Sequence, residues 1–183
     1  DTIAGAIADL GAVELGTRLV VTTLQDQNDS YLVDGASLRE ALEVADGLID
    51  TIVFDPSVFN GTDPGANRIL LTEGEIEVDK PVSIDASGIP SGITVDGGGA
   101  SRILLVQAGG SLSLDTVSLT GGNALGNFGG GIYSFGSVAL RNGSVHDNSA
   151  GVGGGIYNRG ILELENATFF GNSAGTAGGA VQS

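Results

Sequence analysis

The sequence predicts an all-β solenoid, a parallel β-helix with one short α-helix ahead of it. Two observations carry this prediction. A glycine-rich block begins at Gly129, returns at Gly153 and returns, altered, at Gly178, so its copies lie 24 and 25 residues apart. Short apolar pairs spaced by two residues fill the sequence around these blocks. A fixed period of this length is typical of repeat proteins whose units bury their apolar faces only against neighbouring units.

The first expected elements are a strand and a helix. Residues 17–24 are rich in β-branched side chains, which predicts a strand. Ser37 and Glu40 fit a capping box at the start of a helix. The apolar residues that follow share one helical face: Leu38, Ala41, Leu42 and Ala45. We therefore expect a helix over residues 37–46, followed by a strand at residues 51–54 and a loop.

From residue 69 onward, short strands alternate with turns. Two apolar residues on the same side mark each strand: Ile76/Val78, Val82/Ile84, Ile93/Val95, Leu112/Leu114, Val117/Leu119, Val138/Leu140 and Leu162/Leu164. Leu114, Leu140 and Leu164 correspond in successive repeats, so we expect them to stack inside the solenoid. A repeat of about 24 residues suits three short strands and three turns, with coils ~4.8 Å apart in parallel ladders. β-Propeller blades are longer, and the spine of leucine-rich repeats is missing.

Glycine and asparagine are expected at the corners of the coils. The Gly blocks allow tight turns where larger side chains would collide. Asn123, Asn148 and Asn172 recur in step with them. We interpret this row as an Asn ladder, in which each amide bonds to the next and tolerates a left-handed turn.

These elements divide the chain into three parts. Residues 1–16 are an N-terminal extension or the end of a preceding module, residues 17–68 open the domain, and residues 69–183 form the coils. Ser183 falls partway through a repeat, so we expect an unpaired parallel edge there. Further coils or the start of another copy would cover this edge, and a head-to-tail contact between copies would grow into a filament.

Composition excludes several kinds of partner. The chain has 22 acidic and 7 basic residues and a formal net charge of −15, which repels nucleic acid and anionic lipid headgroups. No apolar run approaches the roughly 18 residues of a membrane span. Because Cys is absent, the chain has neither a disulfide framework nor a thiolate metal site.

Two groups of motifs resemble known proteins. Residues 37–42 (Ser-Leu-Arg-Glu-Ala-Leu) and 50–55 (Asp-Thr-Ile-Val-Phe-Asp) resemble the SLREA-type opening region of bacterial extracellular right-handed parallel β-helix proteins. The Gly-Gly-Gly-Ile-Tyr blocks and residues 169–172 (Phe-Phe-Gly-Asn) resemble the GGA[IV] and FxxN repeats of polymorphic outer-membrane proteins. Residues 9–14 are similar to a segment that closes such modules. The resemblance covers roughly residues 17–183 and implies a right-handed parallel β-helix, a helix capping its first coil, and an extracellular or cell-surface location.

One loop has the residue types of a calcium site. Asp26, Asn28, Ser30 and Asp34 place oxygen ligands at alternate positions of a D-x-N-x-S segment and just beyond it. Tyr31 stands where a calcium loop has glycine, and an Asx-rich loop without a cation explains the same residues. Calcium is the one cofactor that the sequence suggests.

The signals for catalysis are weaker. Polysaccharide lyases and hydrolases use this fold, and hydrolysis needs two carboxyl groups at a defined separation. The acidic and basic residues of the coils are expected to be scattered: Asp79, Asp85, Asp96, Asp115, Arg102, Arg141 and Arg159. His146 is the only histidine, and the adjacent Asp147 is expected on the opposite face of a strand. The Gly blocks lack the Lys-Ser/Thr of a phosphate-binding loop.

The sequence thus predicts a noncatalytic structural or adhesive segment of a large secreted or cell-surface repeat protein. Its expected partners are the rest of a larger polypeptide, other copies of the chain, and surface carbohydrate or protein. The alternative is a carbohydrate-active β-helix enzyme, a polysaccharide lyase or hydrolase, whose site lies outside this segment or is unidentified within it.

Overall fold

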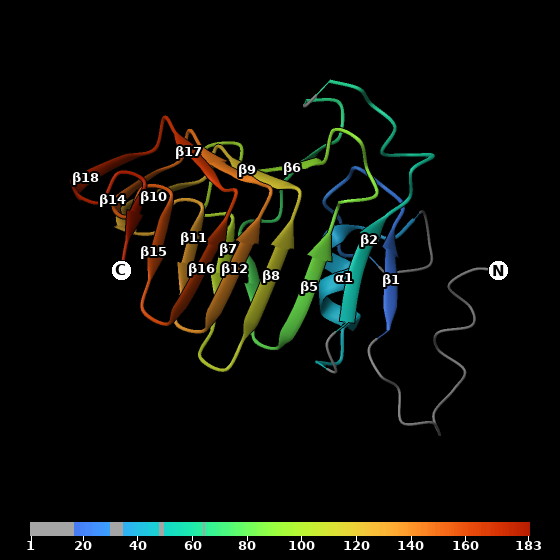
Figure 1. The fold of residues 1–183 in the computed structure, drawn as a ribbon, viewed down its shortest axis with the longest axis horizontal. Coiled ribbons are helices and arrows are strands. Elements are labelled where there is room, and N and C mark those ends of the chain that lie inside the picture. The colour runs from blue at the N-terminus through green and yellow to red at the C-terminus, as the bar shows by residue number, and fades with distance from the viewer. Residues whose placement is uncertain (1–16, 30–34, 48–49, 64) are drawn as a thin grey trace.

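The chain forms a parallel β-solenoid with a single short α-helix in the part that the computed structural model describes, residues 17–29, 35–47, 50–63 and 65–183 (Figure 1). Every strand pairing is parallel. The predicted all-β parallel β-helix with a helix at its N-terminal end is confirmed.

In the described residues, four parallel sheets form the sides of the solenoid, and each is named here by a letter. Sheet A contains β1 (Arg18–Val21), β2 (Asp50–Phe54), β5 (Pro81–Asp85), β8 (Ser111–Asp115), β12 (Ser137–Arg141) and β16 (Ile161–Glu165). Sheet B contains β3 (Arg68–Leu70), β6 (Ile93–Asp96), β9 (Val117–Thr120), β13 (Ser144–His146) and β17 (Thr168–Phe170). Sheet C contains β4 (Ile76–Val78), β7 (Leu104–Val106), β11 (Ile132–Ser134), β15 (Ile156–Asn158) and β19 (Val181–Gln182). Sheet D contains β10 (Asn123–Phe128), β14 (Ser149–Val152) and β18 (Ser173–Ala177).

The fourth sheet corrects the prediction of three strands per coil. The chain runs through sheets A, B and C in the coil that begins at β5, and through A, B, D and C in the three coils that begin at β8, β12 and β16. The strands of sheet D consist largely of Ala, Gly, Ser and Asn. They lack the alternating apolar pairs that mark the other strands, which is why the pattern did not indicate them.

The helix α1 (Leu38–Val44) closes the N-terminal end of the core. Its capping box is present as predicted, because Ser37 Oγ accepts the Glu40 amide N–H at 3.1 Å and Glu40 Oε2 accepts the Ser37 amide N–H at 2.9 Å. The predicted apolar face is buried in the core: Leu38, Ala41, Leu42 and Ala45. Figure 1 shows α1 behind β2, at the N-terminal end of the solenoid. The helix thus occupies the place that strands of sheets B and C take in the later coils.

The interior is a column of aliphatic side chains in strict register. Leu114, Leu140 and Leu164 pair across β8, β12 and β16, as predicted. Leu114 and Leu140 are fully buried, whereas Leu164, on the last coil, is 43% exposed. Sheet B contributes a second column, in which Val145 pairs with Leu119 on β9 and with Phe169 on β17.

Glycine turns the chain from sheet D into sheet C. Gly129, Gly153 and Gly178 have φ of 60°, 63° and 63°, the left-handed region that side chains disfavour. A Cβ at Gly129 would lie 2.1 Å from the carbonyl oxygen of Ile132. The predicted role of the Gly blocks as tight corners is confirmed.

The Asn ladder at the corner after sheet B differs from the predicted one by one residue. Asn148 Nδ2 donates to Asn172 Oδ1 at 3.0 Å, and the amide N–H of Gly122 donates to Asn148 Oδ1 at 2.7 Å. Asn123 instead pairs in register with Ser149. Gly122 therefore stands at the ladder position of its coil, and Asn123 lies one residue beyond it.

A second ladder lies at the corner between sheets A and B. Thr116, Asn142 and Asn166 all have positive φ, between 50° and 59°. Asn166 Nδ2 donates to Asn142 Oδ1 at 3.2 Å, and Asn142 Nδ2 donates to Asp115 Oδ1 at 3.0 Å. These bonds tie three successive coils together at a corner where L-residues are strained.

Candidate functional site

Asp26, the first residue of the predicted calcium loop, binds protein donors. Its carboxylate accepts hydrogen bonds from Arg39 Nε at 2.8 Å and from the amides of Thr72 and Glu73 at 2.7 and 3.0 Å. Burial raises the pKa of Asp26, but the bonds from Arg39, Glu73 and Thr72 outweigh it and hold that pKa below its usual range. Arg39 also donates to the carbonyl oxygens of residues 74 and 75. Asp26 and Arg39 thus join the loop and α1 to the turn before β4.

Of the other predicted calcium ligands, Asn28 is the one that lies among the described residues. Asn28 Nδ2 donates to Glu43 Oε1 at 3.0 Å. Ser30 and Asp34 lie outside the described residues, so calcium binding by the full set stays a prediction. Within the described residues, no cluster of three or more His, Asp or Glu side chains is arranged to hold a metal ion.

His146 has a carboxylate partner in Asp147, a residue that was predicted to lie on the opposite face of the strand. Asp147 is a corner residue with φ of 53°, and its Oδ2 lies 2.8 Å from His146 Nδ1. Thr120 Oγ1 lies 3.2 Å from the same nitrogen, and the Phe170 ring stacks on the imidazole at 4.4 Å. A triad needs the nucleophile and the carboxylate on different ring nitrogens. Here both partners share Nδ1, so the three groups do not form a proton relay.

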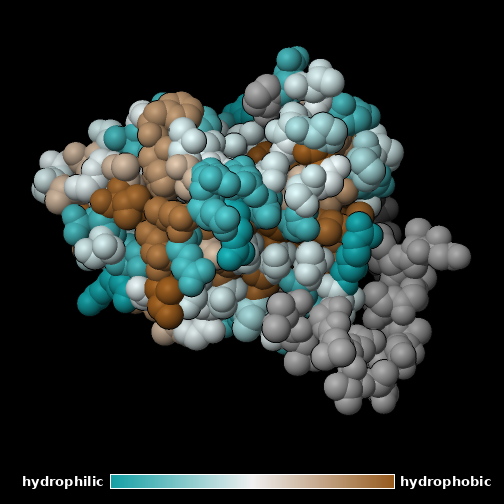
Figure 2. Space-filling model, viewed as in Figure 1, coloured by the Kyte–Doolittle hydropathy of each residue, from teal (hydrophilic) through white to brown (hydrophobic). Residues whose placement is uncertain are grey.

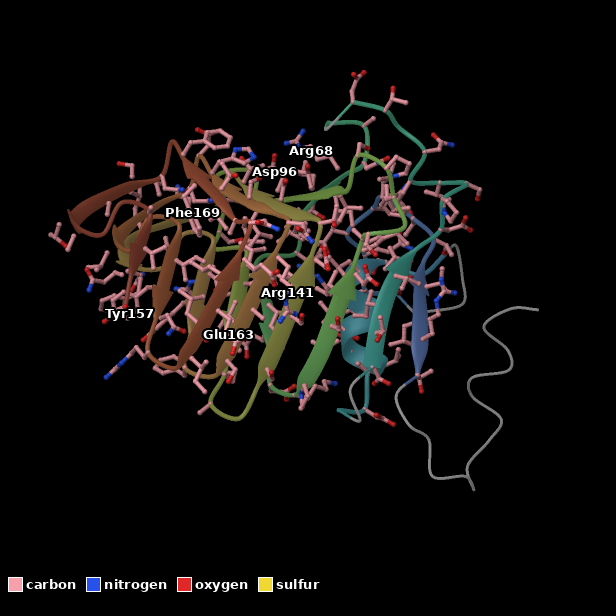
Figure 3. The ribbon with its side chains drawn as sticks, viewed as in Figure 1. Arg68, Asp96, Arg141, Tyr157, Glu163 and Phe169 are labelled. Carbon is pink, nitrogen blue, oxygen red and sulfur yellow. The ribbon has the colours of Figure 1, made fainter. Side chains whose placement is uncertain are left out.

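A column of charged residues runs along the outer face of sheet A. The prediction of scattered charges is wrong for Asp85, Asp115 and Arg141, which pair in register on β5, β8 and β12. Glu165 continues the column on β16. Arg141 Nε donates to Glu165 Oε2 at 3.1 Å, and its NH2 nitrogen lies 4.0 Å from an oxygen of Glu163 (Figure 3). These three side chains are about half exposed or more. Exposed pairs of this kind contribute little to stability.

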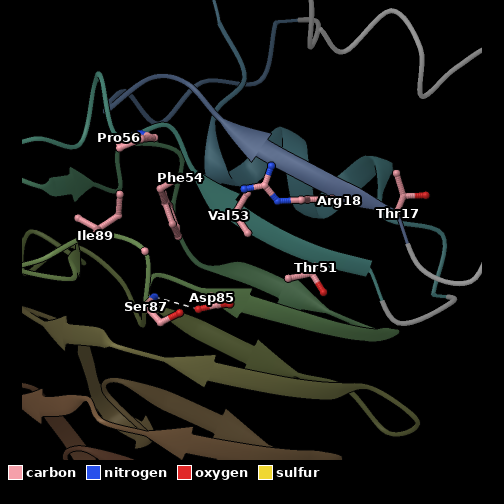
Figure 4. Close-up of a pocket in the computed structure, with 10 residues that line it drawn as sticks. Thr17, Arg18, Thr51, Val53, Phe54, Pro56, Asp85, Ser87 and Ile89 are labelled. Atoms are coloured by element: carbon pink, nitrogen blue, oxygen red, sulfur yellow. Dashed lines mark hydrogen bonds between the residues drawn. The ribbon is translucent and has the colours of Figure 1, made fainter. Parts of the chain in front are cut away.

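A hollow lies at the N-terminal side of this face (Figure 4). Its volume is about 480 Å³, and its walls combine apolar groups with the hydroxyls of Thr17, Thr51 and Ser87. Arg18 has no ion pair or side-chain hydrogen bond among the described residues. Asp85, the one carboxylate in the lining, accepts the Ser87 amide N–H at 2.9 Å. The hollow can admit a small polar molecule, but its lining does not supply the two carboxyl groups of glycoside hydrolysis.

The last coil forms an open edge, here called the C-terminal edge, made of β16, β17, β18 and β19. Each of these strands is the last of its sheet in the described structure, so one side of its backbone lacks a strand partner. Interior side chains come to the surface here: Leu162, Leu164, Phe169 and Val181 are buried only in part. Figure 2 shows hydrophobic residues gathered over β16 at this end of the molecule. The edge therefore combines unpaired peptide groups with exposed apolar surface.

One buried polar atom near this edge is unsatisfied. Asn158 Oδ1, on β15, is the buried side-chain oxygen without a hydrogen-bond partner among the described residues. The Asn158 side-chain amide donates to the Gly160 carbonyl at 2.8 Å. Asn158 lies one coil inside the edge, next to β19. An unsatisfied buried acceptor costs about 1–3 kcal/mol.

None of the described segments forms a helix that is long and apolar enough to cross a membrane. Comparisons of the chain with protein-family models, curated proteins and solved structures found no match.

Proposed function

We propose that this chain is a noncatalytic structural and adhesive segment of a large secreted or cell-surface repeat protein. In this proposal the solenoid acts as a rigid rod, and its C-terminal edge is a stacking interface. The partner at the edge is a further parallel coil, supplied by the rest of a larger polypeptide or by another copy of the chain. The observation that carries the proposal is the C-terminal edge itself.

The chemistry of the edge supports a stacking role. Unpaired strand edges in water attract other strands, and proteins usually protect them with inward-pointing charges, prolines or covering elements. The inward positions of β16 are Leu162 and Leu164, which carry no charge. The acidic side chains of the strand, Glu163 and Glu165, point outward and lie beside Arg141. A strand stacked on β16 would thus meet an apolar inner face.

Sedimentation equilibrium over a range of protein concentrations tests the proposal. The unmodified chain is expected to associate at high concentration, and more so in salt, because salt screens the repulsion between acidic copies. Leu164→Lys places a charge on the inner face of the edge and should abolish association. Ile161→Lys adds the same charge on the outer face of the same strand, where Ile161 is already 62% exposed, and should leave association unchanged. A strictly monomeric unmodified chain, or equal effects of both variants, would contradict the stacking role.

A second candidate function is supported by one observation, the register of Asp85 and Asp115 on neighbouring strands of sheet A beside Arg141. A carbohydrate-active β-helix enzyme needs carboxylates and a basic group on consecutive coils. Release of reducing ends or of a 4,5-unsaturated product from a panel of polysaccharides would reveal such an enzyme. Asp115→Asn should then abolish turnover. Turnover by the unmodified chain would overturn the noncatalytic proposal.

A further inference from the structure

Four aromatic rings cluster on the outer face of sheet C. Tyr133 and Tyr157 pair in register on β11 and β15, and their ring centroids are 5.4 Å apart. Phe128 reaches over them from the end of β10, with its centroid 5.6 Å from Tyr133 and 4.5 Å from Tyr157. Phe135, in the turn after β11, lies 4.5 Å from Tyr133. We call these four residues the aromatic patch.

The patch is an unusual use of aromatic residues in this chain. The sequence has only 3 Tyr and 6 Phe and no Trp, so four of its nine aromatic residues meet at this one place. The core does not need them there, because the interior positions of the same strands are held by Ile132 and Ile156, which are fully buried. Phe128 and Phe135 are 39% and 38% exposed. Clustered, exposed aromatic residues on a protein surface are typical of binding sites.

Polar groups around the rings remain available to a ligand. Within the described residues, the hydroxyls of Tyr133 and Tyr157 have no hydrogen-bond partner. Arg159 lies over the Phe135 ring at 5.8 Å, and its guanidinium has no ion pair in the described chain. Arg102, by contrast, is held in place by Glu75 and by two backbone carbonyls. The patch thus combines ring faces with two free hydroxyls and one free guanidinium.

The size of the patch argues for a narrow ligand. A Phe or Tyr side chain has roughly 200 Å² of surface, so four rings exposed by no more than 39% offer at most about 300 Å². A stable protein partner covers about 800 Å² on each side. An acidic chain would also be opposed by the net charge of −15. A thin, neutral, hydroxyl-rich polymer fits both the small area of the patch and the negative charge of the chain.

The spacing of the coils suits a sugar polymer. Pyranose rings present apolar C–H faces that pack on aromatic rings, and their hydroxyls accept and donate hydrogen bonds at the rim. Tyr133 and Tyr157 stand on neighbouring coils, which are ~4.8 Å apart in a parallel ladder. One sugar unit of an extended β-1,4-linked chain rises by nearly the same distance. A chain lying along the solenoid axis would therefore place one sugar unit on each coil.

We propose that the aromatic patch binds a neutral β-1,4-linked glycan. Because the two tyrosine rings are nearly perpendicular, at 76°, one ring packs against the C–H face of a sugar and the other offers its edge, while the Tyr hydroxyls and Arg159 bind the sugar hydroxyl groups. This site would provide the adhesive contact, and to that extent it rests on the proposed function. It lies on the outer face of sheet C, one coil inside the C-terminal edge, because Tyr157 pairs with Gln182 of β19.

Calorimetric titration of the chain with cellohexaose and with the hexamer of N-acetylglucosamine tests the site. At least one of these glycans should bind, and polygalacturonate should not. Tyr157→Ala and Phe128→Ala should each weaken binding by about tenfold or more, as expected for a central ring of a binding site. Phe170→Ala is the matched control, because Phe170 is 53% exposed on sheet B and stacks on His146 instead. It should leave the affinity unchanged.

The outcomes separate this site from the stacking role. Absence of binding to both neutral hexamers, preference for polygalacturonate, or an equal loss in the Phe170→Ala control would overturn the glycan site. Phe128→Ala removes a ring that is 39% exposed and keeps the test valid if Tyr157→Ala fails to fold, which a melting curve would reveal. Sedimentation of the edge variants is independent of these results, so failure of one proposal does not mimic failure of the other.

Discussion

Leu114, Leu140 and Leu164 stack in sheet A. We predict that the stability lost when one of these leucines is changed to Ala depends on whether its coil lies inside the solenoid or at its end. Leu140 is fully buried between Leu114 and Leu164, so Leu140→Ala removes its side chain from a packed interior. The expected loss is about 2–5 kcal/mol of unfolding free energy, which includes the cavity left behind. Leu164 is 43% exposed, and full burial of a Leu is worth about 1.5–3 kcal/mol, so Leu164→Ala should cost roughly 1 kcal/mol.

Urea unfolding followed by far-UV circular dichroism measures both losses. In a solenoid each coil contacts only its neighbours, so Leu164→Ala should loosen mainly the last coil while Leu140→Ala destabilises the coils on both sides. The measurement belongs at low protein concentration, where stacking between copies is absent. At high concentration a stacked copy would bury Leu164 and raise the cost of its truncation. Equal losses for the two variants at low concentration would refute the assignment of Leu140 to the interior.

Three further predictions concern the cap, the buried carboxylate and the Asn ladder. Leu42→Asp should unfold or aggregate the chain because Leu42 lies on the buried face of α1, whereas Val44→Asp, at a position 50% exposed on the same helix, should leave the melting temperature nearly unchanged. Asp26 has a lowered pKa in the folded state, so its stabilisation is present above the unfolded pKa of about 3.9 and is lost as the pH falls through the lower folded value. Asp26→Asn should therefore lower the melting temperature at neutral pH and weaken its fall in acid; identical acid profiles would contradict this. Asn148→Ala leaves buried backbone groups unpaired and should cost about 1–3 kcal/mol by urea unfolding, against a smaller loss for Asn142→Ala on the exposed ladder.

The fold could be predicted because two local signals agreed with a fixed period. Apolar pairs such as Val138/Leu140 mark which side of a strand faces inward, and the period places them in register with the pairs one coil away. The helix could be predicted as well, since Ser37 and Glu40 form a capping box and the apolar face begins with Leu38, the residue after Ser37. The capping box and the apolar pairs each depend on residues that are close together in the sequence, so both can be recognised without knowledge of the fold.

The predicted Asn ladder was displaced by one residue because two neighbouring strands of sheet D differ in length. Ala124 and Ala150 pair in register, and so do Phe128 and Val152, so β10 holds two more residues than β14 between the same pairs. When the repeats are aligned at a constant period, these two extra residues shift the alignment. Asn123 was therefore predicted at the ladder position that Gly122 occupies. The repeat period alone cannot reveal such a bulge when the strand has no alternating apolar residues to fix its register.

The charged column on sheet A was missed for the same physical reason. Asp85 and Asp115 are 30 residues apart in sequence, because the loop that follows β5 is longer than its counterparts. The two residues still pair directly, since strand register and not sequence distance decides which side chains meet. The partnership of His146 with Asp147 was missed because the left-handed φ of Asp147 breaks the alternation of an ideal strand.

The two ends of the solenoid differ, and this difference decides which partner fits the C-terminal edge best. At the N-terminal end, sheet A extends to β1, but α1 takes the place of strands in sheets B and C, and Asp26 and Arg39 fasten it to the coil beyond. A second copy stacked head to tail would therefore offer the edge a single matching strand, β1. A further coil of the same kind would offer a partner for all four edge strands. Because each added strand pairs backbone groups and covers apolar surface, a full coil should bind far more tightly than a second copy. Association of the chain with itself is thus expected to be weak and to require high concentration, and micromolar or tighter self-association would show that the cap does not limit stacking.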